Sequence, residues 1–237
     1  MPPSRRLVVA ALFALAATGL TGGCTSGGGT PTPTPSEPTA AERLAAAKTK
    51  LDAASSMHLS LTSRNLPEQV SGVVSADGWG THAPAFKGTF QVKVKGVAAD
   101  SEIVAVDGAV YAKLPFVSIF AKVDPATLGA PDPAILFDRT TGLSSLLTAT
   151  RNPTIGTKTR RGAEVVLPIS GTLEGKAVAD LLKVGGADST YQVTYGLTDP
   201  AGELRSVEIT GPFFGSATST YTLVLDRYGE PVDIKKP

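Results

Sequence analysis

The chain has 237 residues, of which 42% are apolar and 18% are charged, and Cys24 is its single cysteine. This length suits one domain with a sizeable core, and one cysteine excludes an internal disulfide framework. The 22 basic and 21 acidic residues nearly cancel and form no basic run, so the chain lacks the positive surface that nucleic acid requires. The charged fraction lies below the roughly 25% usual for globular domains, so an excess of apolar side chains must be buried somewhere.

Residues 1–23 predict a secretory signal peptide. Arg5 and Arg6 give it a positive start, and residues 7–20 form an apolar run that is too short for a membrane span. Cys24 at the expected cleavage point is typical of a bacterial lipobox, although Thr21 replaces the leucine usual three positions earlier. We therefore expect lipidation of Cys24 and export to the outer face of the plasma membrane. An ordinary signal peptide with a free cysteine is the alternative, and the two arginines also fit twin-arginine export.

Residues 24–38 predict an extended tether, because this stretch is rich in threonine, proline and glycine and cannot pack a core. Its length corresponds to a reach on the order of 40 Å. Residues 39–237 carry no second linker and no internal repeat, so they predict a single domain.

The domain begins with a predicted helix over residues 40–55. Thr39 and Glu42 have the spacing of a capping box, and Leu44, Ala47 and Leu51 fall on one face with Ala54. From residue 57 the apolar spacing changes to two, which predicts strands. We expect strands over residues 57–62, 70–76, 89–95, 102–106, 109–114, 154–160, 165–169, 191–197, 204–210 and 217–225, with a possible edge strand at 232–234.

The clearest local prediction is the hairpin around Asp107 and Gly108. A two-residue type I′ turn there pairs Val106 with Ala109 and sets Glu102 opposite Lys113. Further helices are expected over residues 142–149, capped by a threonine at 140 or 141, and over 174–183, and residues 115–123 have helical spacing. About ten strands and three or four helices favour an α+β fold, a large curved antiparallel sheet with helices on one face.

Catalytic or metal-binding motifs are absent from the sequence. Residues 78–83 loosely match a dinucleotide fingerprint, but Pro84 follows at once, so we interpret them as a glycine-rich hairpin end. The only histidines, His58 and His82, are expected to be solvated. No catalytic residue, metal or cofactor is predicted, and three aspartates that could bind calcium are interpreted as a surface loop: Asp124, Asp132 and Asp138.

The apolar surplus concentrates on the strands of the first half and on residues 115–123. These side chains either line a cavity under the sheet or pack against the helices as an ordinary core. The candidate lining residues are Phe90, Val92, Val94, Ile103, Ala105, Val110, Ala112 and Leu114.

Several segments resemble the mycobacterial LppX/LprA/LprF/LprG lipoprotein family, and its LprG branch most. They are residues 102–114 (EIVAVDGAVYAKL), 56–62 (SMHLSLT), 132–136 (DPAIL), 141–147 (TGLSSLL), 169–171 (ISG) and 229–232 (GEPV). The resemblance implies a half-barrel similar to LolA and LolB, with helices on the concave side and an apolar cavity. It also implies binding of triacylated glycolipids such as phosphatidylinositol mannoside or lipoarabinomannan, or of triacylglycerol, and cooperation with a major-facilitator exporter.

The resemblance and the composition together predict a non-enzymatic, membrane-anchored carrier of long-chain lipids. Phe116, Ile119 and Phe120 are candidate lid residues, and Phe213 and Phe214 are expected either in a membrane- or ligand-touching loop or as core anchors. Two alternatives remain: an envelope scaffold with a filled core and no cargo, or an envelope hydrolase with an unrecognised motif.

Overall fold

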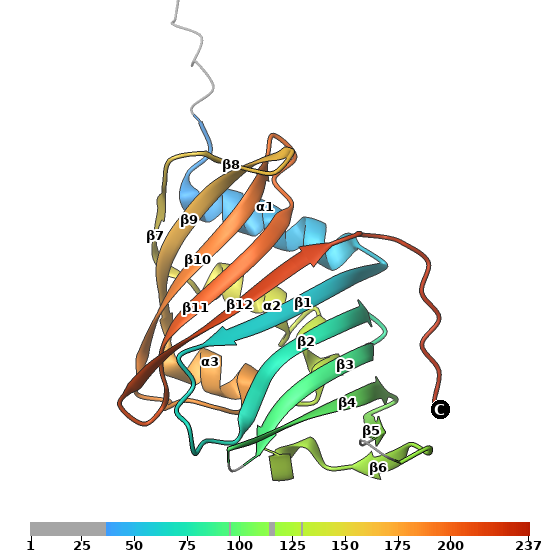
Figure 1. The fold of residues 1–237 in the computed structure, drawn as a ribbon. Helices are drawn as coiled ribbons and strands as arrows, with labels where there is room; N and C mark the ends of the chain where they lie inside the picture. The colour runs from blue at the N-terminus through green and yellow to red at the C-terminus, as the bar shows by residue number, and fades with distance from the viewer. Residues whose placement is uncertain (1–36, 95, 114–116, 129) are drawn as a thin grey trace, which may run out of the picture. The chain divides into compact units, whose positions relative to one another are not determined.

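The computed structural model describes residues 37–237 except residues 95, 114–116 and 129 (Figure 1). The described residues form one compact unit. Cys24, Leu114 and Phe116 lie outside the described residues, as do the predicted signal peptide and nearly all of the tether.

In the part of the chain that the structure describes, twelve strands form one antiparallel sheet. Their order is β6-β5-β4-β3-β2-β1-β12-β11-β10-β9-β7, and β8 pairs with β9. The strands are β1 (Ser56–Arg64), β2 (Gly72–Thr81), β3 (Ala85–Val94), β4 (Val97–Val106), β5 (Ala109–Lys113), β6 (Ala121–Val123), β7 (Arg151–Ile155), β8 (Thr159–Arg161), β9 (Glu164–Glu174), β10 (Thr190–Asp199), β11 (Leu204–Phe214) and β12 (Ala217–Asp226).

The sheet consists of two wings that meet at β1 and β12. The first wing runs outward from β1 to β6, and the chain then crosses to the far edge and returns through β9, β10 and β11 to β12. Seven residue pairs join the wings, from His58 opposite Asp226 to Arg64 opposite Thr220. The first and last strands therefore form the middle of the sheet.

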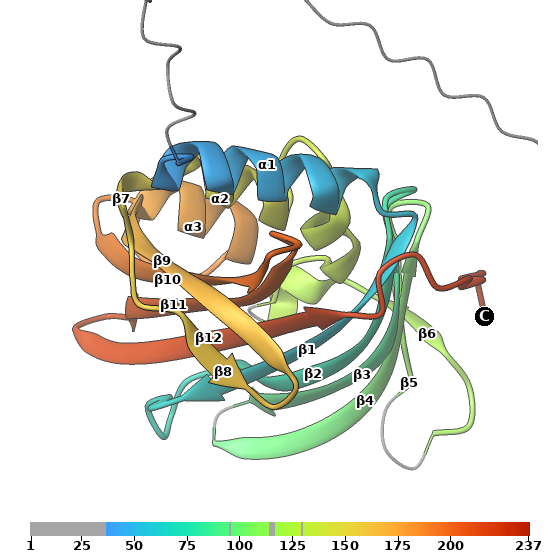
Figure 2. The same ribbon diagram turned by 90° about the horizontal axis from the view of Figure 1, so that it is seen from above.

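The helices lie together on the concave side of the sheet (Figure 2). They are α1 (Ala40–Ala53), α2 (Leu143–Ala149) and α3 (Gly175–Leu182), with two 3₁₀ helices, η1 (Pro125–Leu128) and η2 (Pro133–Phe137). The predicted α+β class, curved antiparallel sheet and helix layer are confirmed.

The local predictions with the strongest sequence signals are confirmed. The Thr39 side chain accepts from the Glu42 backbone N–H, and the Glu42 carboxylate accepts from the Thr39 backbone N–H at 2.7 Å. Val106 pairs with Ala109, and the Lys113 Nζ lies 2.8 Å from Glu102 Oε1.

Other sequence predictions are wrong in detail. Residues 121–123 form strand β6 despite their helical spacing, and residues 232–234 form no strand. Thr141 does not cap α2, because its hydroxyl donates to the carboxylate of Asp138. Phe213 and Phe214 belong to β11 rather than to a loop, since the turn falls after them. Strands β2, β3 and β4 are each longer than expected, because the cross-strand pairing continues beyond the residues that show clear alternation.

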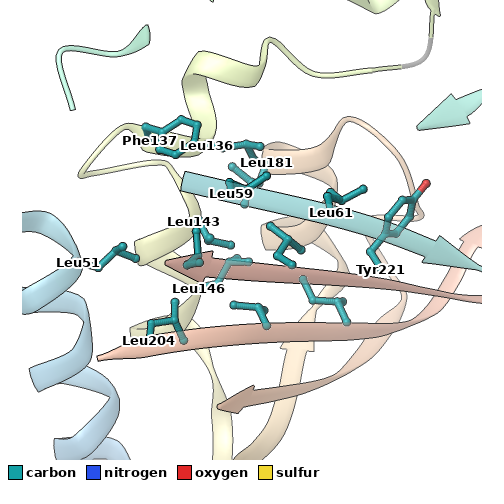
Figure 3. Packing of buried hydrophobic residues seen from close by; sticks show 14 of the residues in the cluster. Leu51, Leu59, Leu61, Leu136, Phe137, Leu143, Leu146, Leu181, Leu204 and Tyr221 are labelled. Atoms are coloured by element: carbon teal, nitrogen blue, oxygen red, sulfur yellow. The ribbon is translucent and has the colours of Figure 1, made fainter. Parts of the chain in front are cut away.

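The core lies between the concave face and the helices. Leu59 and Leu61 of β1 alternate with polar residues that face the other side, as predicted, and they point toward η2 and α3 (Figure 3). Leu51 of α1 and Leu146 of α2 complete this packing from the helix layer and are buried. Figure 3 shows Tyr221 of β12 at one end of the cluster.

The glycines of the loose dinucleotide fingerprint have a packing role. Gly80 lies inside β2, and a Cβ added there would stand 2.2 Å from ring carbons of Phe137. Phe137 is the last residue of η2, and its ring also stacks with that of Phe86 at 6.1 Å between centroids. Gly80 therefore allows an aromatic ring to rest directly on the strand backbone, which fixes η2 against the sheet.

His82 is buried, so its expected solvation is wrong. It sits in the turn after β2, where its Nε2 lies 2.8 Å from the carbonyl oxygen of Leu51 and its Nδ1 faces the carbonyl oxygen of Phe137. One side chain thus joins the end of α1, the end of η2 and the β2–β3 turn. This link reinforces the contact of Phe137 with Gly80.

We predict that Gly80→Ala lowers the free energy of unfolding by about 1–3 kcal/mol, because the new methyl group overlaps the Phe137 ring. Chemical denaturation measures this change. In a Phe137→Ala background the same substitution should cost much less, since the ring that it meets is gone. Additive effects in the double variant would contradict direct contact.

We also predict that His82→Phe is destabilising, because the carbonyl oxygen of Phe137 loses its partner, while that of Leu51 keeps the Ala54 backbone N–H. The expected cost is about 1–3 kcal/mol for the carbonyl left unsatisfied. His58→Phe, at a histidine on the other face of the sheet, is the control in the same denaturation experiment. Equal stability of wild type and His82→Phe would show that the bridge contributes nothing.

Candidate functional site

An apolar pocket lies between the concave face of the sheet and the helix layer. Twelve residues line it, and Tyr221 carries the one polar side-chain group among them. They come from the sheet, from the segment around η2 and from the end of α3: Leu59, Leu61, Val73, Ala76, Phe86, Phe90, Pro131, Pro133, Leu136, Leu182, Val184 and Tyr221.

The burial of the lining residues distinguishes the floor of the pocket from its mouth. Leu59 and Phe86 are each only 1% exposed and form the floor. Pro131, before η2, and Leu182 and Val184, at the end of α3, are half-buried. These two segments form the more exposed side of the pocket, which we call its mouth, and Phe90 of β3 is the one lining residue of the sheet that is also half-buried.

The pocket is narrow in this structure. Its volume is about 50 Å³, which is well below the roughly 300–1,000 Å³ of typical small-molecule sites. An acyl chain could enter only if the lining segments moved apart. The half-buried segments at the mouth have fewer contacts to lose in such a movement than the floor has.

The structure distributes the sequence-predicted lining residues between the pocket and the core. Phe90 lines the pocket, where its ring meets Phe86 edge-on at 5.5 Å between centroids. Val92 is half-buried and packs against the core, and Val94 belongs to β3. Four others are buried in the core but are not among the residues that line the pocket: Ile103, Ala105, Val110 and Ala112.

The two described lid candidates lie between β5 and β6. Ile119 is 71% exposed and Phe120 is half-buried, and neither is among the lining residues. The pocket is instead covered by Pro131, Pro133 and Leu136.

Sequence reasoning missed most of the lining residues. The alternation of Leu59 and Leu61 indicated an inward face, but not that a pocket lies over it. Tyr221 shares the inward face of β12 with Leu223 and Leu225, and this alternation was the one signal that could have placed it. The residues after α3 carry no such signal, because their position depends on packing between distant segments.

Phe213 is a core anchor. It is 3% exposed, and its ring lies between those of Tyr191 and Tyr221, at 4.8 Å and 4.9 Å between centroids. Phe214 is half-buried and packs against the core, and its ring also approaches Gly72 at the start of β2. This aromatic row supports the pocket wall from the second wing.

His58 lies on the convex face in a polar cluster, and its side chain is 17% exposed, so it too is less solvated than expected. Its Nδ1 is 2.9 Å from Asp226 Oδ1, its Nε2 is 3.3 Å from Asp77 Oδ1, and its ring meets Trp79 edge-on. The cluster links β1, β2 and β12 and is separated from the pocket by the sheet.

The candidate calcium-binding aspartates have structural roles. Asp132 accepts a hydrogen bond from the Ala134 backbone N–H and caps η2. Hydrogen bonds from Thr141 lower the pKa of Asp138, so this turn is stabilised by the ionised carboxylate. Within the described residues, no group of three or more His, Cys, Asp and Glu side chains could hold a metal ion.

A membrane span requires a helix of about 20 mostly apolar residues, and the described helices can be judged by this requirement. None of them is both long enough and apolar enough to cross a bilayer.

Two solved structures of mycobacterial proteins have a fold similar to that of this chain. LprF from Mycobacterium bovis is 22% identical, with a TM-score of 0.66, and the match covers 84% of this chain and 96% of that one. The Mycobacterium tuberculosis lipoprotein LppX is 18% identical, with a TM-score of 0.63 and coverage of 84% and 100%. A LolA superfamily protein from Nitrosomonas europaea reaches a TM-score of only 0.28, so the resemblance to LolA gains no support from it.

A search of the curated proteins found no match. The LppX_LprAFG lipoprotein family, in contrast, matches residues 38–234, which include every helix and strand described above. The chain belongs to the LppX_LprAFG lipoprotein family.

Proposed function

We propose that this protein is a membrane-anchored lipoprotein that binds long-chain acyl lipids in the pocket under its sheet and carries them across the cell envelope. The observation that carries the proposal is the pocket itself, whose wall holds one polar side-chain group among twelve residues. Membership of a lipoprotein family supports an exported, envelope-associated protein. The cargo class is an acylated glycolipid of the phosphatidylinositol mannoside or lipoarabinomannan type, or triacylglycerol, and a major-facilitator exporter is the proposed partner.

Transfer energetics explain why such a carrier needs an apolar wall rather than catalytic groups. Each methylene that leaves a bilayer for water costs about 0.8 kcal/mol, so a 16-carbon chain costs on the order of 12 kcal/mol. Contacts to a headgroup cannot offset this for two or three chains. A pocket that opens to accept the chains makes the transfer nearly neutral, and the destination membrane can then drive release.

A scaffold with a filled core is the second candidate function, and one observation favours it. The pocket volume of about 50 Å³ leaves little free space in this structure. The two functions differ in whether the pocket expands around a ligand. A scaffold would have no lipid other than its own anchor.

Native mass spectrometry of the mature chain, residues 24–237 with Cys24→Ala, separates these functions. The protein is produced in a lipid-rich actinobacterial host, and bound material is extracted with organic solvent. We expect a bound mass that resolves into a multi-acyl lipid. A clean apo mass, with no stabilisation by added lipid, would establish the scaffold instead.

Phe90→Trp should reduce the bound lipid fraction several-fold, because a larger ring at a half-buried position narrows the pocket beside Phe86. The domain should stay folded, since Phe90 is not part of the fully buried core. Val224→Trp adds the same ring to the opposite face of the sheet, where Val224 is 38% exposed. Equal lipid loading of wild type and Phe90→Trp would remove Phe90 from the binding site.

Cys24→Ala in the full-length chain should move the protein from the membrane fraction to the soluble exported fraction. The physical reason is that the proposed diacylglycerol on the Cys24 thiol is the anchor. Mass spectrometry of the N-terminal peptide identifies the lipid in the wild type, and Thr25→Ala is the matched control. An unmodified Cys24 thiol in the wild type would leave the ordinary signal peptide as the correct interpretation.

A further inference from the structure

Tyr221 is the one lining residue that breaks the apolar character of the pocket. It lies on the inward face of β12, between Ile209 of β11 and Ser63 of β1, and it is 5% exposed. Its ring is held edge-on by Phe213, with 4.9 Å between centroids and an interplanar angle of 85°. The side chain is therefore fixed in position at the pocket wall.

The hydroxyl of Tyr221 points away from the labelled leucines of the core (Figure 3). It lies near the start of β2, because a Cβ added to Gly72 would stand 3.6 Å from it. Val73, the residue after Gly72, also lines the pocket, so the hydroxyl lies beside the part of the lining at the start of β2. As the one polar group on an apolar wall, it is suited to the polar group at which the hydrocarbon chain of a ligand ends.

Three other tyrosines, two in strands of the second wing and one after β12, show how buried hydroxyls are satisfied in this protein. Tyr191 donates to the carbonyl oxygen of Pro212 at 3.2 Å, and Tyr195 donates to that of Leu146 at 3.0 Å. Tyr228 donates to the carbonyl oxygen of Leu204. Within the described residues the structure gives the Tyr221 hydroxyl no hydrogen bond of this kind, and it is not one of the fully buried polar atoms that lack a partner, so part of its surface stays accessible.

A hydroxyl that is largely shielded from water and has no protein partner gains free energy when a ligand accepts its hydrogen bond. Burial raises the pKa of Tyr221 to about 12, so the hydroxyl keeps its proton and remains a donor at neutral pH. The group it suits is an uncharged acceptor at the end of a hydrocarbon chain. An acyl carbonyl oxygen has this chemistry and projects from the chain, whereas a plain alkyl chain has no acceptor and an ether oxygen lies within the chain between two carbons, where it is less accessible.

We propose that the Tyr221 hydroxyl donates a hydrogen bond to an acyl carbonyl oxygen of the bound lipid and thereby selects acyl lipids over ether lipids of the same length. This inference rests on the proposed function, since it assigns a residue to the same pocket. The hydrogen bond also sets how deep the chain inserts, because the carbonyl marks the boundary between chain and headgroup. Tyr221 is thus a specificity residue in an otherwise non-selective apolar pocket.

The test is a competition between two lipids that differ only in their carbonyls. The mature Cys24→Ala chain is incubated with vesicles that contain equal amounts of dipalmitoyl-phosphatidylcholine and its diether analogue, dihexadecyl-phosphatidylcholine. Native mass spectrometry resolves the two complexes by mass. We expect the wild type to prefer the diester by about three- to tenfold, the range that one net hydrogen bond supports.

Tyr221→Phe should abolish this preference while the binding of the diether lipid stays unchanged, because the ring that packs on Phe213 is kept. Tyr191→Phe removes a hydroxyl that already has a partner outside the pocket, so it should keep the preference. Thermal unfolding confirms that both variants are folded.

A diester preference that persists in Tyr221→Phe would overturn the assignment of Tyr221. An equal loss of both lipids would also overturn it, since that result indicates a role in shape rather than in carbonyl recognition. If the wild type takes up neither lipid and none of its host's lipids, the proposed carrier function itself fails, and this outcome is distinct from the other two.

Discussion

The contact of the Phe137 ring with the backbone of Gly80 is the constraint on which the arrangement of the helix layer depends. A ring can rest there only because Gly80 has no Cβ, since even a methyl group would stand 2.2 Å from it. The η2 backbone follows the ring, and His82 holds the end of η2 together with the end of α1. Through Pro133 and Leu136, this position of η2 determines the cover of the pocket. The shape of the pocket thus follows from a residue without a side chain.

The same constraint acts on the floor of the pocket, whereas the residues at its mouth are less buried. Leu59 of β1 and Phe86 form the floor, and the ring of Phe86 is held in place by its stacking contact with the ring of Phe137. The mouth is bordered by Pro131, by the end of α3 and by Val184, all of them half-buried. Under the proposed function, a lipid enters by separating these border segments while η2 stays in place. A carrier needs this combination, because loading must not cost the stability of the core.

The sequence predicted the features that depend on neighbouring residues. The capping box at Thr39, the turn at Asp107 and the pairing of Glu102 with Lys113 all follow from local spacing, and all are present. Prediction from the sequence failed where a feature depends on residues that are far apart in the chain. Gly80 is required only because the ring of Phe137 packs on its backbone. His82 is buried only because α1 and η2 end beside it. The pocket could not be placed for the same reason, since its lining joins strands, η2 and α3 that are far apart in the chain.

The pairing of β1 with β12 in the middle of the sheet has a consequence for biogenesis. His58 and Asp226 face each other across 168 positions of sequence, so contacts at the centre of the fold are among the most non-local in the chain. Such topologies fold slowly, because a long loop must close before the contacts form. Until β12 is available, β1 presents an unpaired edge and an uncovered row of leucines, a state prone to aggregation. Under the proposed export, passage of the chain in an unfolded state would leave this edge exposed until residue 226 has emerged, so delivery by that route would depend on protection during export as much as on the stability of the finished fold.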